Sequence, residues 1–295
     1  MLRPGATRAP AKMNLTLEIL APRTDGYHGV RSVMLPLGLY DEIRWEPAER
    51  FGFRVEGQAP ADETNLVPRA FRALGIAPAL DVTLVKRIPS GGGLGGGSSD
   101  AAAILRAAAS GAFGELGERD YVGIARALGS DVPFFLVETG ALVEATGERV
   151  TALGALPEWW AVVVLPGVAV ATAAAYKALD AARGARYTPR ARNASPSLQA
   201  VEAVQRSDFE AAVRAAGNDF EPVIARQEPR IAASLRALRE AGARLAMLCG
   251  SGSSCVALTE SRADADALAS RLHAFETRVV PLHHADSWRR ERVSR

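Results

Sequence analysis

Apolar and polar residues alternate near the start of the chain, and this pattern predicts a β-strand. In residues 11–20 four apolar side chains (Met13, Leu15, Leu17, Ile19) alternate with four polar ones (Lys12, Asn14, Thr16, Glu18). Successive side chains of a strand point to opposite faces, so Lys12 and Asn14 share one face. That face is either the solvated side of a half-buried strand or a surface that carries chemistry.

The same approach predicts alternating strands and helices further along the chain. Strands are expected at residues 31–47, 51–57 and 81–89, and helices at 65–75, 100–109 and 121–129, with Asn65 capping the first helix and Gly75 ending it. A turn and a hairpin follow in residues 130–150. Beyond a predicted domain boundary near residue 155 come a strand at 158–167, helices within 209–243, a strand–turn–strand at 244–260, a helix at 263–275 and a strand at 277–282. The chain therefore reads as two domains, residues 1–155 and 156–295.

Composition excludes several classes of protein. Of the 295 residues, 48% are hydrophobic and 23% charged, and the net charge of +2 gives no broad basic field for nucleic acid. The longest apolar run, residues 159–176, is broken by Pro166 and Gly167, so no membrane span is expected. Two cysteines and no signal-peptide pattern predict a cytoplasmic protein, and the four histidines do not have the spacing of a metal-ligand cluster.

Lysine is rare in this chain. Of 35 basic residues only Lys12, Lys86 and Lys177 are lysines, and the others are arginines. A lysine kept against such a bias either stands where a compact ammonium is needed or is retained by chance.

The most informative stretch is RIPSGGGLGGGSSDAAAIL, residues 87–105. Gly91 to Ser99 contain six glycines and two serines directly before a predicted helix. Glycine loses much conformational freedom on folding, so this density indicates a need for bare backbone. A glycine loop at a helix N-terminus is a phosphate site, because its N–H groups and the helix dipole favour an anion.

Alternatives to a phosphate loop remain at this point. The stretch could be a flexible turn with Ser98 or Ser99 as helix cap and Asp100 complementing the dipole. No Gly-Lys-Ser/Thr follows, which excludes a Walker A loop. A GxGxxG pattern fits at Gly91, Gly93 and Gly96, but polyglycine matches almost any such pattern, and a dinucleotide fold places it in its first βα unit.

Other residues are candidates for chemistry. Lys12 and Asn14 could supply a cation and a hydrogen-bond donor, and Asp131, before Pro133 and two phenylalanines, could act as a base or cap a turn. Tyr27 and His28 follow a turn and could stack on a nucleobase or simply lie at the edge of the core. CGSGSSC, residues 249–255, could direct backbone amides toward an anion.

Five segments in this order resemble the galactokinase–homoserine kinase–mevalonate kinase–phosphomevalonate kinase (GHMP) superfamily: AKMNLTL, RTDGYHGVRSVM, IPSGGGLGGGSSDAA, GSDVPFFL and CGSGSSC. The resemblance implies an α+β fold with an N-terminal ATP-binding domain of ribosomal-protein-S5-like type and a C-terminal ferredoxin-like α/β sandwich. DGYH and GLGGGSSDAA resemble those members that phosphorylate the 2-hydroxyl of a cytidyl diphosphate derivative of methylerythritol, in non-mevalonate isoprenoid synthesis.

The resemblance also implies residue roles. Asp131 would take the hydroxyl proton beside Lys12, Asn14 would position the substrate, and Tyr27 and His28 would hold the cytosine. Asn65 is expected near the adenine, and Thr172 on the substrate side. The ATP phosphate loop would comprise Pro89, Ser90, Gly91, Gly92, Gly93, Leu94, Gly95, Gly96, Gly97, Ser98 and Ser99. Mg²⁺ is expected with ATP, without assigned ligands.

Three other functions are weighed against this kinase. A kinase that phosphorylates a mevalonate-type acid would need additional cationic side chains to bind the substrate carboxylate, and it would not need Tyr27 and His28. A non-enzymatic nucleotide-binding protein would lack Lys12 or Asp131, and a Rossmann dehydrogenase would bind NAD(H). Cys249 stands where serine is common in the family, and the oligomeric state is not predicted.

Overall fold

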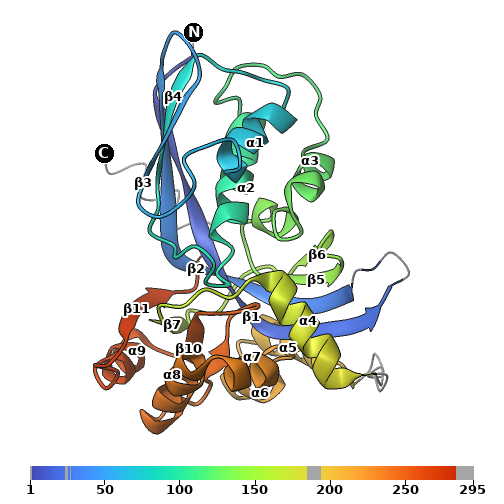
Figure 1. Ribbon diagram of the computed structural model, residues 1–295, viewed down its shortest axis with the longest axis vertical. Helices are drawn as coiled ribbons and strands as arrows, with labels where there is room; N and C mark the ends of the chain where they lie inside the picture. The colour runs from blue at the N-terminus through green and yellow to red at the C-terminus, as the bar shows by residue number, and fades with distance from the viewer. Residues whose placement is uncertain (1, 24–25, 27, 185–193, 284–295) are drawn as a thin grey trace. The chain divides into compact units, whose positions relative to one another are not determined.

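The computed structural model describes residues 2–23, 26, 28–184 and 194–283 as an α+β protein with two sheets (Figure 1). Two compact units divide the chain. Unit 1 takes Met1–Ala11, Leu39–Ser90 and Gly95–Glu138, and unit 2 takes Lys12–Gly38, Gly91–Leu94 and Thr139–Arg295. Each unit is thus assembled from separate stretches of sequence. The division into domains 1–155 and 156–295 stays a prediction.

Unit 1 is a small sheet covered by helices. Its strands come from the first residues of β1 (Gly5–Pro22), the second half of β2 (His28–Pro47), β3 (Gly52–Glu56) and β4 (Leu80–Val85). β2 pairs with β4 in antiparallel register, and β3 pairs with β4 in parallel. The helices α1 (Leu66–Ala73), α2 (Gly96–Ala109) and α3 (Tyr121–Leu128) lie on one side of this sheet, with the 3₁₀ helix η1 (Pro133–Leu136) packed on α2.

Unit 2 contains the remaining elements. They are β5 (Ala141–Ala145), β6 (Arg149–Ala152), β7 (Trp160–Leu165), α4 (Thr172–Arg183), α5 (Pro196–Gln205), α6 (Phe209–Ala215), β8 (Gly217–Asn218), α7 (Glu221–Gln227), α8 (Pro229–Glu240), β9 (Met247–Leu248), β10 (Cys255–Thr259), α9 (Arg262–Ala269) and β11 (Glu276–Pro281). Four of these strands form an antiparallel sheet in the order β11-β7-β10-β9. β5 and β6 form the hairpin that the sequence predicts.

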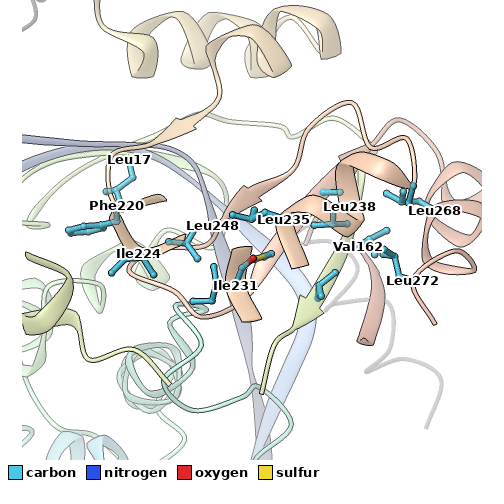
Figure 2. Close-up of a cluster of buried hydrophobic side chains, with 14 of the residues drawn as sticks. Leu17, Val162, Phe220, Ile224, Ile231, Leu235, Leu238, Leu248, Leu268 and Leu272 are labelled. Carbon is cyan, nitrogen blue, oxygen red and sulfur yellow. The ribbon is translucent and has the colours of Figure 1, made fainter. Parts of the chain in front are cut away.

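The core of unit 2 lies between this sheet and its helices (Figure 2). Val162 on β7 meets Leu235 and Leu238 from α8 and Leu268 from α9, while Phe220 continues the cluster toward β1. Burying each such side chain stabilises the fold by about 1.5–3 kcal/mol. In the described part of the chain, no helix has the length and apolar character that crossing a bilayer requires.

Most of the predicted elements are confirmed, and two boundaries are corrected. Helix α2 begins at Gly96 rather than Asp100, because the preceding Gly95 adopts a left-handed φ of 71°, which is not helical, and no side chain caps the helix. Ser98 and Ser99 therefore lie inside the first turn, and their interpretation as caps is wrong. Helix α9 ends at Ala269 instead of 275.

The solvated-face interpretation of the first strand is also wrong. Lys12, Asn14, Thr16 and Glu18 are all buried, with 0–4% exposure. The alternation in β1 therefore separates an apolar interior face from a polar interior face.

The start of α2 is fastened to the unit 1 sheet by a buried charge cluster. Nζ of Lys86, at the end of β4, donates to Asp41 on β2 and to Oδ2 of Asp100 on α2, the latter at 2.9 Å. Asp41 Oδ1 also accepts the backbone N–H groups of Arg87 and Ile88, at 2.6 and 2.8 Å. One ammonium thus links both strands to the helix that follows the glycine loop.

The cluster holds one carboxylate more than it has cations. Burial raises the pKa of Asp100 to about 8, against the opposing effect of Lys86 and with a further increase from Asp41. Burial alone would lower the pKa of Lys86, but the carboxylates of Asp100 and Asp41 outweigh it and raise that pKa. Asp100 Oδ1 is buried and has no hydrogen-bond partner among the described residues, and burying an ionised oxygen in this way is costly, which favours the protonated carboxyl.

Asp100→Asn should be tolerated because it replaces a carboxyl that is protonated at neutral pH with a neutral amide. Between about pH 4 and about pH 8 the folded protein holds a proton on Asp100 that the unfolded chain has released. The free energy of unfolding of the wild type should therefore decrease, relative to that of the variant, as the pH rises through this window. Urea denaturation at about pH 5 and about pH 8 measures the difference.

The companion variant Lys86→Met should cost about 3–5 kcal/mol, because it leaves Asp41 buried without a counter-charge. Parallel stability curves for wild type and Asp100→Asn over the whole window would contradict a protonated Asp100.

Candidate functional site

The glycine loop is divided between the two units, with Gly91–Leu94 in unit 2 and its other residues in unit 1. Three of its glycines have a left-handed backbone conformation. The φ angles of Gly91, Gly93 and Gly95 are 70°, 75° and 71°. Gly93 also needs its bare backbone for space, because a Cβ there would stand 1.9 Å from the carbonyl oxygen of Cys249. The glycine content thus reflects close backbone packing as well as turn geometry.

Within unit 2, the middle of the loop is held by strand β1 and by the CGSGSSC turn. The N–H of Lys12 donates to Leu94 O at 2.9 Å, and the N–H of Ser254 donates to Gly92 O at 3.0 Å. The thiol of Cys249 lies 3.5 Å from Gly93 O. The turn therefore supports the loop, and at Ser254 its amide is used by the protein instead of by an anion.

The last part of the loop forms the start of α2 in unit 1. The N–H of Ser99 donates to Gly95 O at 2.9 Å, which leaves the preceding amides without partners inside the helix. Ser99 Oγ is buried and has no hydrogen-bond partner among the described residues. A helix start with open amides and a buried free hydroxyl can bind a phosphate.

Lys12 and Asn14 are brought together in unit 2, as their shared strand face predicts. Lys12 Nζ donates to Asn14 Oδ1 at 2.7 Å, and Asn14 Nδ2 donates to Ser32 Oγ at 2.8 Å. Ser32 Oγ in turn donates to Thr16 O at 2.6 Å. Because the single Ser32 proton is used on Thr16, Ser32 must accept from Asn14, which turns the amide oxygen toward the ammonium.

Asp131 lies in unit 1, in the turn between α3 and η1. The turn is closed by the N–H of Val132, which donates to Gly129 O at 3.2 Å. Asp131 is half-buried next to the fully buried Pro133 and Phe134. Arg106 on α2 fixes the following segment by donating to Phe135 O. The N-cap of η1 is Val132, so Asp131 does not hold that position.

Several other predicted site residues serve the fold. Asn65 is the cap of α1, because its Oδ1 accepts from the N–H of Val67 at 2.9 Å and its Nδ2 donates to Pro60 O at 2.8 Å. Thr172 begins α4, with its hydroxyl 3.0 Å from Ser251 Oγ. The contacts predicted for these two residues with adenine and substrate stay predictions, as do those of the half-buried Pro89 and the exposed Ser90 and Gly97.

His28 begins β2 and contacts helix α4. Its Nε2 lies 2.9 Å from Asp180 Oδ1, and its ring stacks on that of Tyr176 with centroids 5.3 Å apart. Tyr27, the predicted partner of His28, lies outside the described residues.

Three supporting residues were not predicted from the sequence. They are Ser32 beneath Asn14, Asp180 beside His28, and Asn218, whose Nδ2 donates to Gly250 O at 2.7 Å. A Cβ on Gly250 would lie 3.2 Å from Lys12 Nζ, so Asn218 anchors a turn that borders the lysine. Each is far in sequence from the residue it supports, and no local pattern marks it.

Comparison with known proteins defines the class to which this fold and site belong. A family model described as GHMP kinases N terminal domain matches residues 65–139, and one described as GHMP kinases C terminal matches residues 200–276. A homoserine kinase from Cytophaga hutchinsonii shares the fold, with a TM-score of 0.67 at 20% identity and 96% of each chain covered. The class is therefore that of the GHMP kinases.

Relatives with higher sequence identity show to which family of GHMP kinases the chain belongs. A 4-diphosphocytidyl-2-C-methyl-D-erythritol kinase from Deinococcus radiodurans is 38% identical over 90% of this chain and 87% of its own. One from Anaeromyxobacter sp. is 40% identical over 92% of this chain and 87% of its own. A crystal structure of a 4-(cytidine 5'-diphospho)-2C-methyl-D-erythritol kinase has a TM-score of 0.76 at 33% identity, covering 95% of this chain and 100% of that one. The chain belongs to the 4-diphosphocytidyl-2-C-methyl-D-erythritol kinase family within the GHMP kinases.

Gly93→Ala should lower the free energy of unfolding by more than about 2 kcal/mol, because it adds a backbone clash to a left-handed φ. Gly91→Ala is the matched control in the same loop. Its φ is nearly equal, but its Cβ would meet only Ala169 Cβ, at an ordinary 3.5 Å. Gly91→Ala should therefore cost only about 1 kcal/mol. Equal losses for both variants in urea denaturation would contradict the close approach.

Ser32→Ala should destabilise the protein by about 1–3 kcal/mol, because it leaves the buried Asn14 amide and Thr16 carbonyl short of a partner. Ser32→Thr keeps the hydroxyl and should recover most of the loss. The measurement is again urea denaturation, and an alanine variant as stable as wild type would exclude the proposed hydrogen-bond chain.

Proposed function

We propose that this chain transfers the terminal phosphoryl group of ATP to the 2-hydroxyl of 4-diphosphocytidyl-2-C-methyl-D-erythritol, giving the 2-phosphate and ADP. This reaction belongs to the non-mevalonate (MEP) route to isoprenoid precursors. The observation that carries the proposal is the buried ammonium of Lys12, held by Asn14 on the strand whose backbone binds the glycine loop. Relatives named for this substrate, with 38–40% identity over about 90% of the chain, support the choice of acceptor.

The glycine loop is the proposed phosphate cradle. Pro89 to Ser99 would surround the triphosphate, with the open amides of α2 and the buried Ser99 hydroxyl facing its oxygens. Backbone amides suit this task because they are fixed before the nucleotide arrives and need no reorganisation during transfer. Asn65 is proposed near the adenine.

Lys12 and Asp131 are the proposed catalytic pair. Asp131 would take the proton from the acceptor hydroxyl, and Lys12 would stabilise the charge that develops on the transferred group. Asn14 and Thr172 are proposed on the substrate side, and Tyr27 and His28 at the cytosine. Lys12 is buried, and its hydrogen bond to the Asn14 amide orients the ammonium.

Mg²⁺ is proposed to accompany ATP. This ion retains waters and uses one or two protein oxygens together with phosphates, so it does not need a preformed protein cage. The described residues hold no group of three or more His, Cys, Asp or Glu side chains suited to a metal, and Ser99 Oγ is an unused oxygen at the proposed phosphate site. When bound, the ion would neutralise phosphate charge.

The proposed partners are these small molecules alone, with no nucleic acid or membrane. The proposed location is the cytoplasm, because the two buried cysteines, Cys249 and Cys255, form no disulfide.

Wild type incubated with ATP, Mg²⁺ and the cytidyl substrate should release ADP, and Asp131→Asn should lose about 10²–10⁴ in kcat while still binding ATP. Asp266→Asn, an exposed acid on α9, is the matched control and should leave kcat unchanged. Coupled ADP detection and calorimetry give the two readouts. Phosphorylation of galactose or phosphomevalonate in place of the cytidyl substrate would overturn the substrate assignment, and full turnover by Asp131→Asn would remove Asp131 from the reaction.

A further inference from the structure

The contacts of His28 extend beyond the stacking that the sequence predicts. Tyr176 and Asp180 stand four residues apart on α4, so they share one face of the helix. Tyr176 stacks on the His28 ring at an interplanar angle of 25°, and the Asp180 carboxylate lies 2.9 Å from Nε2. The His28 side chain is only 8% exposed, so this environment, rather than water, orients the ring.

The carboxylate determines where the imidazole proton lies. An ionised carboxylate can only accept a hydrogen bond, so Nε2 must be the nitrogen that carries hydrogen. In the neutral ring the other nitrogen, Nδ1, is then an acceptor. A ring without this partner could place its proton on either nitrogen and offer either a donor or an acceptor at Nδ1.

Cytosine and uracil differ in the group that would meet such an acceptor. Cytosine carries an amino donor at position 4, whereas uracil, like thymine, carries a carbonyl acceptor there. An acceptor at Nδ1 can accept a hydrogen bond from the amino group of cytosine. Opposite the carbonyl of uracil it would meet a second acceptor, and neither atom would have a hydrogen bond. Discrimination by leaving polar groups unpaired is stronger than discrimination by shape.

We propose that Asp180 is a positioning residue that makes the base site selective for cytosine over uracil nucleotides, by holding the His28 proton on Nε2. The proposal rests on the proposed function, which places a cytidyl group at His28. One correctly formed pair of this kind is worth roughly ten- to hundredfold in discrimination. The specificity for the base would thus be set from helix α4 and not from the DGYH segment alone.

The test compares CDP and UDP binding by calorimetry in wild type, Asp180→Leu and a control. Asp180 is half exposed at the helix surface, so its replacement should not unfold α4. Lys177→Gln, an exposed change on the same helix, is the control and should retain the wild-type preference. Wild type should prefer CDP by roughly ten- to hundredfold, and Asp180→Leu should lose most of that ratio by weakening CDP binding while UDP binding holds or improves.

Nitrogen-15 NMR of the His28 ring provides a second readout, independent of any ligand. Wild type should show protonated Nε2 and bare Nδ1, and Asp180→Leu should show a mixture of the two tautomers. A CDP-to-UDP ratio unchanged by Asp180→Leu, an equal loss for both nucleotides, or a wild-type ring protonated on Nδ1 would each overturn the role of Asp180. A wild type that shows the expected tautomer but binds no CDP would instead contradict the proposed function.

Discussion

The close approach of two backbones is the constraint on which unit 2 depends. Gly93 lies so near the Cys249 carbonyl that no side chain fits, and on either side of it the main chain bonds Lys12 to Leu94 and Ser254 to Gly92. The strand that carries the lysine, the glycine loop and the CGSGSSC turn are therefore fixed to one another by main-chain groups. A loop held rigidly in this way can present its remaining amides to a charged ligand without reorganisation at the moment of reaction.

Buried lysines recur in this structure, and each is held differently. Lys86 forms ion pairs with two carboxylates and links α2 to the sheet, whereas Lys12 donates a hydrogen bond to the neutral amide of Asn14. Lys177, the third lysine, is exposed. The rarity of lysine thus marks a buried ammonium at two of three positions.

The polar face of β1 is buried because residues distant in sequence supply its hydrogen-bond partners. Thr16 Oγ1 lies 2.8 Å from Ser197 Oγ, and Glu18 Oε1 accepts from the hydroxyl of Ser195 at 2.5 Å. Both serines are near the start of α5, more than 170 positions from β1 in sequence. Their hydroxyls satisfy polar groups that would otherwise be costly to bury. The alternation alone indicates a strand with one apolar and one polar face, but not which of the two faces is exposed to solvent.

The sequence by itself determined most of the elements, the loop and the shared strand face of Lys12 and Asn14, because these follow from local periodicity and glycine content, whereas the α+β class was implied by the resemblance to a known family. Tertiary structure decided what local patterns do not encode: the start of α2 at Gly96, the burial of the β1 polar face, and the support of Asn14 and His28 by Ser32 and Asp180. The reason is physical. The start of α2 depends on the left-handed conformation of Gly95, and burial and proton placement depend on partners that only folding brings within hydrogen-bond distance.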